Sequence, residues 1–327
     1  MERRILSGMR PTGKLHLGHL VGALNNWVDL QKSNRCFYMV ADWHALMSEY
    51  EDPKALRENS FELVRDFVAS GLDPDKSVIF IQSHVPEHLE LAMAFSDITP
   101  LGWVERCPTY KEQLREIRGR DLTTYGFLGY PVLQAADIAI YKANAVPVGV
   151  DQVPHLELTR EIIRRFNTIY KAETFPEPEP ILTKTPKLLG IDNRKMSKSY
   201  ANYIALSDTP EEIKKKVSQM ITDPKRIRLT DKGHPDICNV FSYFSIFAKP
   251  EIKDNARDWC EGAKSGCTEC KKNLADILID HLEPIRTRRE RLSDSNVEGI
   301  IAQGAKAARS LARETMDEVK RLINFVV

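Results

Sequence analysis

The chain lacks any apolar run long enough to cross a membrane, which excludes a helical membrane protein. It also lacks a net charge of one sign: 47 lysines and arginines balance 46 aspartates and glutamates, so overall charge does not indicate a nucleic-acid partner. The N-terminal MERRILSG has only Ile5 and Leu6 as apolar residues in succession, which predicts no signal peptide. We therefore expect a cytoplasmic protein whose six cysteines do not form disulfides.

Repeats and low-complexity tracts are also absent, and 327 residues are enough for two domains. Through residues 1–200, helical patterns alternate with strand-like segments, namely RRILSG, CFYMVAD, SVIFIQS and AVPVG. This alternation predicts an α/β fold, a Rossmann-like, doubly wound parallel sheet with helices on both faces. Ligands of such sheets bind beyond the carboxyl ends of the strands. The proline-rich FPEPEPIL, residues 175–182, is expected to be a surface loop.

Residues 201–327 contain little that resembles a strand. Their charged, helix-forming sequence predicts a second, all-helical domain, with a helix start at Ser207 or Asp208 followed by Pro210. From Val297 onward, apolar residues recur at helical spacing. This last helix therefore has an apolar face that can pack back on the first domain.

Two histidines three residues apart, His16 and His19, follow the first expected strand in SGMRPTGKLHLGHLVGAL. A helix starting near His16 would gather free backbone N–H groups and imidazole donors at its N-terminus, which predicts a phosphate site. Gly18 would let an anionic ligand approach the backbone. A lone His-x-x-His is more often a loop with two solvated histidines. The glycines, the preceding strand and a second motif favour the phosphate site.

The second motif is KMSKS, residues 195–199, which follows GIDN in a polar segment. Lys195 and Lys198 with small hydroxyl residues beside them form a cationic loop that suits a polyphosphate gaining charge during reaction. Alone, such a pentapeptide is usually a surface turn. Together with PTGKLHLGH on a chain of alternating strands and helices, it is highly specific.

The two motifs resemble the HIGH and KMSKS signatures of class I aminoacyl-tRNA synthetases, with Leu17 replacing the usual isoleucine. The similarity extends over nearly the whole chain, and SGMRPTGKLHLGH, YPVLQAADIAIY and GVDQVPHLELTR most resemble the bacterial tryptophanyl-tRNA synthetases. The resemblance implies that L-tryptophan and ATP with Mg²⁺ form tryptophanyl-adenylate and pyrophosphate. Tryptophan would then pass to the 3′-terminal adenosine of tRNA(Trp), on a homodimer whose helical domain reads the anticodon.

The resemblance also implies roles for residues of both motifs. His16 and His19 would support the phosphates from the helix end, and Lys195 and Lys198 would neutralise the leaving pyrophosphate. Gly149 and Asp151 match the family's ribose-binding segment. The implied ATP-binding set is Arg10, Pro11, Thr12, Gly18, His19, Gly149, Val150, Asp151, Lys195, Met196, Ser197, Lys198 and Ser199.

The expected amino-acid pocket lies on a helix, where Tyr130, Gln134 and Asp137 share one face. A buried carboxylate there could accept the indole N–H, the polar handle of the tryptophan side chain. The resemblance assigns this role to Asp137, although tyrosine enzymes use a similar arrangement around the substrate amino group. A buried helix with incidental polar residues is the alternative. Gln152 is expected to bind the amino group, while His44 either lines the site or is an ordinary histidine.

Four cysteines in the second domain have the spacing C-x21-C-x6-C-x2-C: Cys238, Cys260, Cys267 and Cys270. Four cysteines in one segment of a cytosolic protein predict a metal site, for which zinc is the common generic occupant. The resemblance favours a 4Fe-4S cluster, because a subset of bacterial tryptophanyl-tRNA synthetases has a very similar spacing. Unligated thiols are the third possibility. Cys36 and Cys107 are expected to be ordinary buried thiols.

Transfer RNA would need basic residues, and two runs in the helical domain supply them, DPKRIRL and IRTRRERL. A charge run is more often a solvated helix face. The candidates for phosphate contacts are Lys225, Arg226, Arg228, Arg286, Arg288, Arg289 and Arg291. The other functions to consider are a tyrosyl-tRNA synthetase, a non-catalytic RNA-binding paralogue and a nucleotidyltransferase that shares only the first signature.

Overall fold

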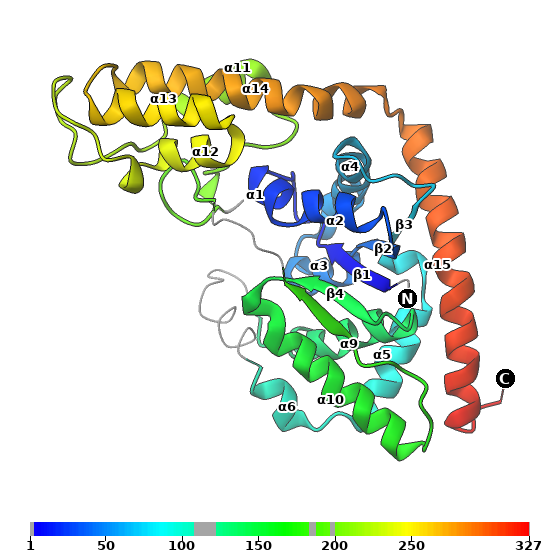
Figure 1. Cartoon of the computed structure of the whole chain (residues 1–327). Helices are drawn as coiled ribbons and strands as arrows, with labels where there is room; N and C mark the ends of the chain where they lie inside the picture. The colour runs from blue at the N-terminus through cyan, green and yellow to red at the C-terminus, as the bar shows by residue number, and fades with distance from the viewer. Residues whose placement is uncertain (1–2, 108–121, 183–187, 197–199, 327) are drawn as a thin grey trace.

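The computed structural model describes residues 3–107, 122–182, 188–196 and 200–326. In this part of the chain, five parallel strands form one sheet in the order β3-β2-β1-β4-β5 (Figure 1). The strands are β1 (Arg4–Met9), β2 (Arg35–Val40), β3 (Ser77–Ile81), β4 (Ala145–Val148) and β5 (Glu179–Leu182). The predicted α/β, Rossmann-like fold is confirmed, and the strand order reverses between β1 and β4.

Strand β2 lies inside the sheet and contributes to the core on both faces. Cys36, Tyr38 and Val40 belong to one hydrophobic cluster, whereas Phe37 and Met39 belong to the other. Successive side chains of a strand point to opposite faces, so a central strand covered on both sides must be apolar at every position. This requirement explains why the run CFYMV could be identified as a buried strand.

The expectation of a surface loop at FPEPEPIL is wrong for its last four residues. These residues form β5, in which Pro180 lies opposite Val146 of β4. Strand β5 ends the sheet and has one neighbour, and proline is tolerated on an edge strand because its missing N–H breaks no ladder on the open side. The strand is also partly exposed, so it lacks the apolar pattern by which the inner strands were found.

Helices cover both faces of the sheet (Figure 1). Apolar residues of α1, α2 and α4 belong to one hydrophobic cluster, and those of α5, α9 and α10 to the other. A π-helical segment, Leu20–Leu24, joins α1 to α2. The helices are α1 (Leu17–His19), α2 (Asn25–Leu30), α3 (Asp42–Glu49), α4 (Leu56–Ala69), α5 (Glu87–Ile98), α6 (Leu101–Glu105), α8 (Tyr125–Leu128), α9 (Tyr130–Ile140) and α10 (Val153–Ile169).

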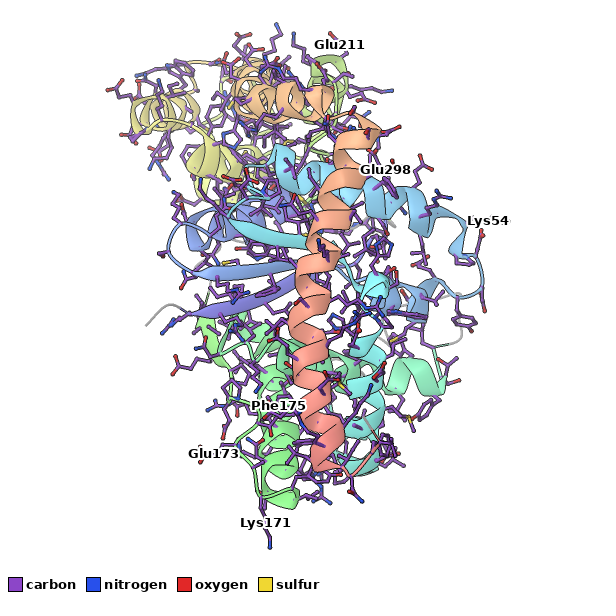
Figure 2. The ribbon with its side chains drawn as sticks, turned by 90° about the vertical axis from the view of Figure 1, so that its right-hand side faces the viewer. Lys54, Lys171, Glu173, Phe175, Glu211 and Glu298 are labelled. Atoms are coloured by element: carbon purple, nitrogen blue, oxygen red, sulfur yellow. The ribbon has the colours of Figure 1, made fainter. Side chains whose placement is uncertain are left out.

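Residues 210–291 are mainly helical and lie beyond one end of the sheet (Figure 1). They contain α11 (Pro210–Ser218), α12 (Asn239–Phe247), α13 (Pro250–Glu261) and α14 (Cys267–Arg291). The chain then turns, and α15 (Asp294–Leu322) runs back in front of the strands (Figure 2). A Cβ at Gly304 would overlap the carbonyl oxygen of Ile79, so α15 approaches β3 at a distance that only glycine allows. Among the described residues, no helix could span a bilayer.

Candidate active site

A cavity of about 460 Å³ opens at the carboxyl ends of β1 and β4, where the strand order reverses. This is the place where open α/β sheets bind ligands. Helix α9 lines it with Tyr130, Gln134 and Asp137, so the helix face expected from their spacing does meet a cavity. Gln152, expected to bind the amino group, also lines it. Further lining residues include Gly8, Arg10, Ala41, His44, Phe127, Gly149 and His155.

Asp137 is buried at the wall of this cavity and both of its carboxylate oxygens accept hydrogen bonds. Gln82 Nε2 and His88 Nδ1 each lie 2.7 Å from Oδ1, and His44 Nε2 lies 2.7 Å from Oδ2. Burial by itself would raise the pKa of Asp137, but the hydrogen bonds from His44 and His88 outweigh it and lower that pKa. Asp137 is therefore an anion at neutral pH and acts as a hydrogen-bond acceptor.

Sequence reasoning missed two of the groups that hold Asp137. Gln82 follows β3 directly, and a polar residue at the carboxyl end of a parallel strand was an available signal. His88 lies in the first turn of α5 and nothing in its local sequence distinguishes it from a surface histidine. His44 was expected either to line the site or to be an ordinary histidine. It lines the cavity and contacts Asp137.

Tyr130 contacts a second buried group at the cavity wall. Its hydroxyl lies 3.4 Å from His155 Nδ1, and Cys107 Sγ lies 3.8 Å from each of these two atoms. Cys107 is buried, and Cys36 is buried in the sheet, as expected for ordinary thiols. The phenol, imidazole and thiol are thus in mutual contact, and Tyr130 and His155 also line the cavity.

The segment around His16 and His19 forms a tight turn and a helix cap. Gly13 has a φ of 118°, a left-handed value that favours glycine. His16 caps α1 by accepting the N–H of Gly18 at Nδ1, 3.1 Å away, and its own N–H donates to His19 Nδ1 at 3.2 Å. A neutral imidazole that accepts at Nδ1 carries its proton on Nε2. Both rings therefore have an N–H donor on the side opposite the cap.

The KMSKS segment lies against this turn. A Cβ at Gly18 would come within 3.2 Å of Met196 Sδ, and the N–H of Leu17 donates to Ile204 O at 3.0 Å. Lys195 is exposed, and Asn202 Nδ2 donates to its carbonyl oxygen at 3.1 Å. Two motifs that are far apart in the sequence are thus adjacent in space.

The remaining ATP-binding candidates lie around the same turn and the loop after β4. Pro11 is buried, and the N–H of Thr12 donates to Arg10 O at 2.9 Å. Gly149 precedes a short 3-10 turn, in which the side chain of Val150 is exposed. Ser197, Lys198 and Ser199 lie outside the described residues, as does the side chain of Asp151.

Known proteins resemble this chain over nearly its whole length. Residues 1–283 match the family described as "tRNA synthetases class I (W and Y)". The tryptophan–tRNA ligase of Thermotoga maritima is 52% identical to this chain over 330 residues, covering 99% of both. The chain belongs to the class I tryptophanyl-tRNA synthetases. A further relative in this family, the tryptophan–tRNA ligase of Aquifex aeolicus, is 44% identical over 98% of this chain and 100% of its own. The tryptophanyl-tRNA synthetase of Campylobacter jejuni, solved with ADP and tryptophan, is 32% identical, with a TM-score of 0.90 over 98% of this chain and 100% of that one.

In this member of the tryptophanyl-tRNA synthetases, the four cysteines of the helical region line one small cavity. Burial, and then the charges of the other three thiol groups, raise the pKa of Cys270 to about 12. The guanidinium of Arg226 lies 3.9 Å from Cys267 Sγ, and a Cβ at Gly233 would overlap Cys260 Sγ. Within the described residues, no set of three or more histidine, cysteine or acidic side chains has the spacing expected around a single metal ion.

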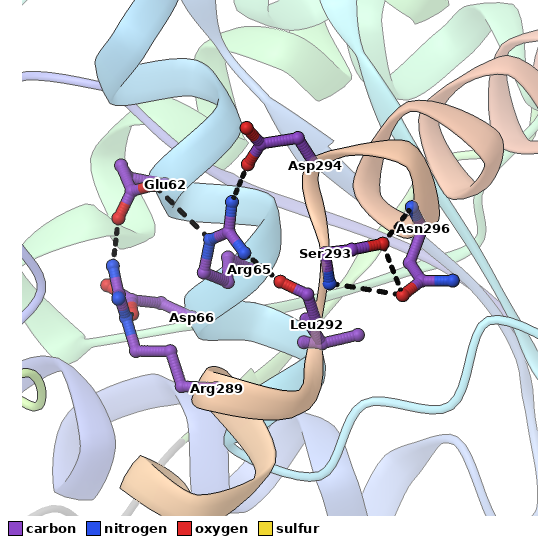
Figure 3. A network of polar contacts seen from close by, with 8 residues as sticks. All are labelled: Glu62, Arg65, Asp66, Arg289, Leu292, Ser293, Asp294 and Asn296. Atoms are coloured by element: carbon purple, nitrogen blue, oxygen red, sulfur yellow. Dashed lines mark hydrogen bonds and ion pairs between the residues drawn. The ribbon is translucent and has the colours of Figure 1, made fainter.

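The basic run IRTRRERL does not face solvent as a unit, which differs both from a solvated helix face and from an open phosphate-binding face, the two alternatives for such a run. Arg286 is buried and pairs with Glu283. Arg288 Nε donates to Ala69 O at 2.6 Å. Arg289 Nε lies 2.8 Å from Asp66 Oδ1 on α4 and its Nη2 pairs with Glu62 (Figure 3). Arg288 and Arg289 thus join α14 to α4, although Arg288 is exposed, as are Lys225, Arg228 and Arg291.

Proposed function

We propose that this protein activates L-tryptophan with MgATP and transfers the activated amino acid to tRNA(Trp). The observation that carries the proposal is the buried Asp137 carboxylate at the wall of the cavity at the sheet's switch point. Gly22 and Ala23, which follow the HIGH-type motif, line the same cavity, and Met196 of the KMSKS segment lies close to Gly18 of that motif. A carboxylate in a cavity that Trp27, Phe127 and Ile138 also line fits a flat aromatic substrate with one N–H donor. Gln152 and Tyr130 line the same cavity and would bind the substrate's ammonium group.

Adenylate formation requires the tryptophan carboxylate to attack the α-phosphate in line while magnesium pyrophosphate leaves. The carboxylate is already ionised at neutral pH, so positioning and charge stabilisation supply the catalysis. His16 and His19 donate from Nε2 to phosphate oxygens, since their Nδ1 atoms serve the helix cap. Lys195 and Lys198 neutralise the charge that develops on pyrophosphate. Arg10, Thr12 and Gly18 lie at the triphosphate end, and Gly149 and Asp151 at the ribose.

The decisive experiment is the exchange of labelled pyrophosphate into ATP with each amino acid in turn. We expect exchange with tryptophan and background rates with tyrosine and phenylalanine. Exchange that depends on tyrosine would reverse the substrate assignment, and no exchange with any amino acid would favour a non-catalytic RNA-binding protein. Charging of tRNA(Trp) by the same preparation tests the second step.

The proposal includes a cytoplasmic homodimer. It also places the tRNA contacts outside the basic run IRTRRERL, whose arginines contact other parts of the chain. Lys225 and Arg228 are exposed near the cysteines and suit backbone phosphates. Each substitution to alanine should weaken tRNA binding and reduce its salt dependence while pyrophosphate exchange is kept. Sedimentation at micromolar concentration distinguishes a dimer from a monomer.

We further propose that Cys238, Cys260, Cys267 and Cys270 hold a 4Fe-4S cluster, with zinc as the alternative occupant. The support is chemical: four soft sulfur ligands around one cavity suit iron–sulfur clusters. Arg226 beside Cys267 would offset the negative charge of a thiolate-bound cluster. Gly233 has no side chain, and a Cβ at this position would overlap Cys260 Sγ. The cluster would supply a rigid centre for α13 and α14, and we assign it no step in activation.

Anaerobic purification followed by iron, sulfide and zinc analysis tests this site. We expect about four irons and four sulfides per chain, as the cluster composition requires. Paired substitution of Cys267 and Cys270 by serine should abolish them, whereas Cys36→Ala, in the sheet core, should not. Stoichiometric zinc without iron would replace the cluster by the alternative. Gly233→Ala should lower metal content without removing a ligand.

A further inference from the structure

We propose that His88 is a positioning residue for indole recognition, which Tyr141 orients and which in turn fixes the carboxylate of Asp137. This inference rests on the proposed role of Asp137 as acceptor of the indole N–H. His88 does not line the cavity and is fully buried behind Asp137. It therefore acts on the substrate only through that carboxylate.

The three groups form a chain of hydrogen bonds with a fixed direction. Tyr141 OH lies 2.7 Å from His88 Nε2, and His88 Nδ1 lies 2.7 Å from Asp137 Oδ1. An ionised carboxylate can only accept, so Nδ1 carries the proton. In the neutral imidazole, Nε2 then accepts from the tyrosine hydroxyl. Burial, and then the charges of Asp137 and Glu87, raise the pKa of Tyr141 well above its ordinary value, which keeps that hydroxyl protonated.

The two oxygens of Asp137 are used unequally. Oδ1 accepts from both His88 and Gln82, whereas Oδ2 accepts from His44 alone among the described residues. A carboxylate held at Oδ1 by two buried donors cannot turn about its own axis without breaking both bonds. Oδ2 consequently keeps one orientation and one remaining acceptor position, which we assign to the indole N–H.

Aromatic packing fixes the side chains that form these hydrogen bonds. The ring of Tyr141 stacks on Phe37 with centroids 4.7 Å apart and meets Phe80 edge-on at 5.5 Å. His88 lies 6.0 Å from the same Phe80 ring. Replacing Tyr141 by phenylalanine removes the hydroxyl and leaves this packing, so the hydrogen bond can be tested separately from the core.

The test compares tryptophan with 3-benzothienylalanine, in which sulfur replaces the indole N–H. The readout is the ratio of kcat/KM for the two amino acids in pyrophosphate exchange, with KM for ATP measured in parallel. We expect His88→Leu to lower this ratio about tenfold, the effect of one charge-assisted hydrogen bond. Tyr141→Phe should lower it in the same direction. His88→Asn should restore much of it, because the asparagine amide places an N–H near the position of Nδ1. His84→Leu, an exposed histidine close in sequence, is the control and should keep the wild-type ratio.

The outcomes separate this inference from the role on which it rests. If Asp137→Ala leaves the ratio unchanged, the role of Asp137 itself is wrong. If Asp137→Ala abolishes the preference while His88→Leu and Tyr141→Phe keep it, only the inference is overturned. Equal losses for both amino acids in the His88 and Tyr141 variants would reduce His88 to a structural residue. In an Asp137→Ala background, His88→Leu should lower the ratio no further. Should His88→Leu fail to fold, Tyr141→Phe decides.

Discussion

Gly18 in the HIGH-type turn lies directly against Met196 of the KMSKS segment. A Cβ at Gly18 would sit 3.2 Å from Met196 Sδ and 3.0 Å from the ring of His16. Both distances are tighter than ordinary van der Waals contact, so a side chain at position 18 would push against His16 and Met196. Under the proposed function, such a side chain would disturb the groups that bind the phosphates of ATP.

Gly18→Ala should therefore impair ATP use more than tryptophan binding. We expect kcat/KM for ATP in pyrophosphate exchange to fall about tenfold or more, since small misplacements of catalytic groups have large effects on rate. Gly102→Ala is the matched control, because a Cβ there meets no described atom within 4 Å. An unchanged KM and kcat for ATP in Gly18→Ala would mean that the two motifs have room to separate.

Lys195→Ala and Lys198→Ala should each lower the rate of activation about a hundredfold while KM for tryptophan changes little. The charge of these lysines is needed mainly as pyrophosphate leaves, so it stabilises the transition state more than the ground state. Single-turnover adenylate formation measures the rate directly. Lys215→Ala, an exposed lysine on α11, serves as the control. Parallel losses in ground-state affinity and rate would contradict the assignment.

The acid stability of the protein should reflect Asp137. Its pKa is lowered from 3.8, so its contribution to the free energy of unfolding is present above pH 3.8 and is lost as pH falls through the lower pKa of the folded state. Asp137→Asn lacks this titration. The difference in Tm between wild type and Asp137→Asn should shrink between about pH 5 and about pH 2. A difference that stays constant over this range would show that Asp137 does not titrate with folding.

The junction between α14 and α4 depends on Arg289, which pairs with the buried Asp66 (Figure 3). Arg289→Ala should lower the free energy of unfolding by about 2 kcal/mol, because it removes a hydrogen bond to a buried carboxylate from a partly exposed cation. Arg291→Ala, two residues further and exposed, should change it by less than about 0.5 kcal/mol. Denaturant unfolding measures both. Adding Asp66→Asn to Arg289→Ala should recover part of the loss, and no recovery would mean that the arginine acts through packing alone.

Two glycines of α15 offer a matched pair of substitutions. Gly304→Ala should be strongly destabilising, because the methyl group would overlap the backbone of Ile79 and push α15 from β3. At Gly299 a Cβ meets no described atom within 4 Å, so Gly299→Ala should stabilise the helix by about 0.5–1 kcal/mol. Thermal unfolding of both variants checks the contrast. Equal shifts of Tm would show that α15 does not need its close approach to the sheet.

Strand β2, the turn before α1 and one face of α9 could be predicted from the sequence, because residues close together in the chain determine them. The continuous apolar run of β2 identified a strand buried on both faces, and Gly13, His16 and Gly18 identified a turn and a helix cap within a few residues of each other. The i, i+4, i+7 spacing of Tyr130, Gln134 and Asp137 placed them on one side of α9. In each case, backbone geometry over one or two turns determines where the side chains lie.

The tertiary structure decided the contacts between segments that are far apart in the sequence. Gln82, His88 and Tyr141 come from three elements and acquire a common role only where those elements pack around Asp137. Arg288 and Arg289 have the sequence of a phosphate-binding run, yet α4 supplies acceptors that bind them within the chain. Strand β5 is defined by its neighbour β4, since its own residues lack an apolar pattern. Charge and hydrogen-bonding capacity are properties of the sequence, but the partner that satisfies them is chosen by the packing of the whole chain.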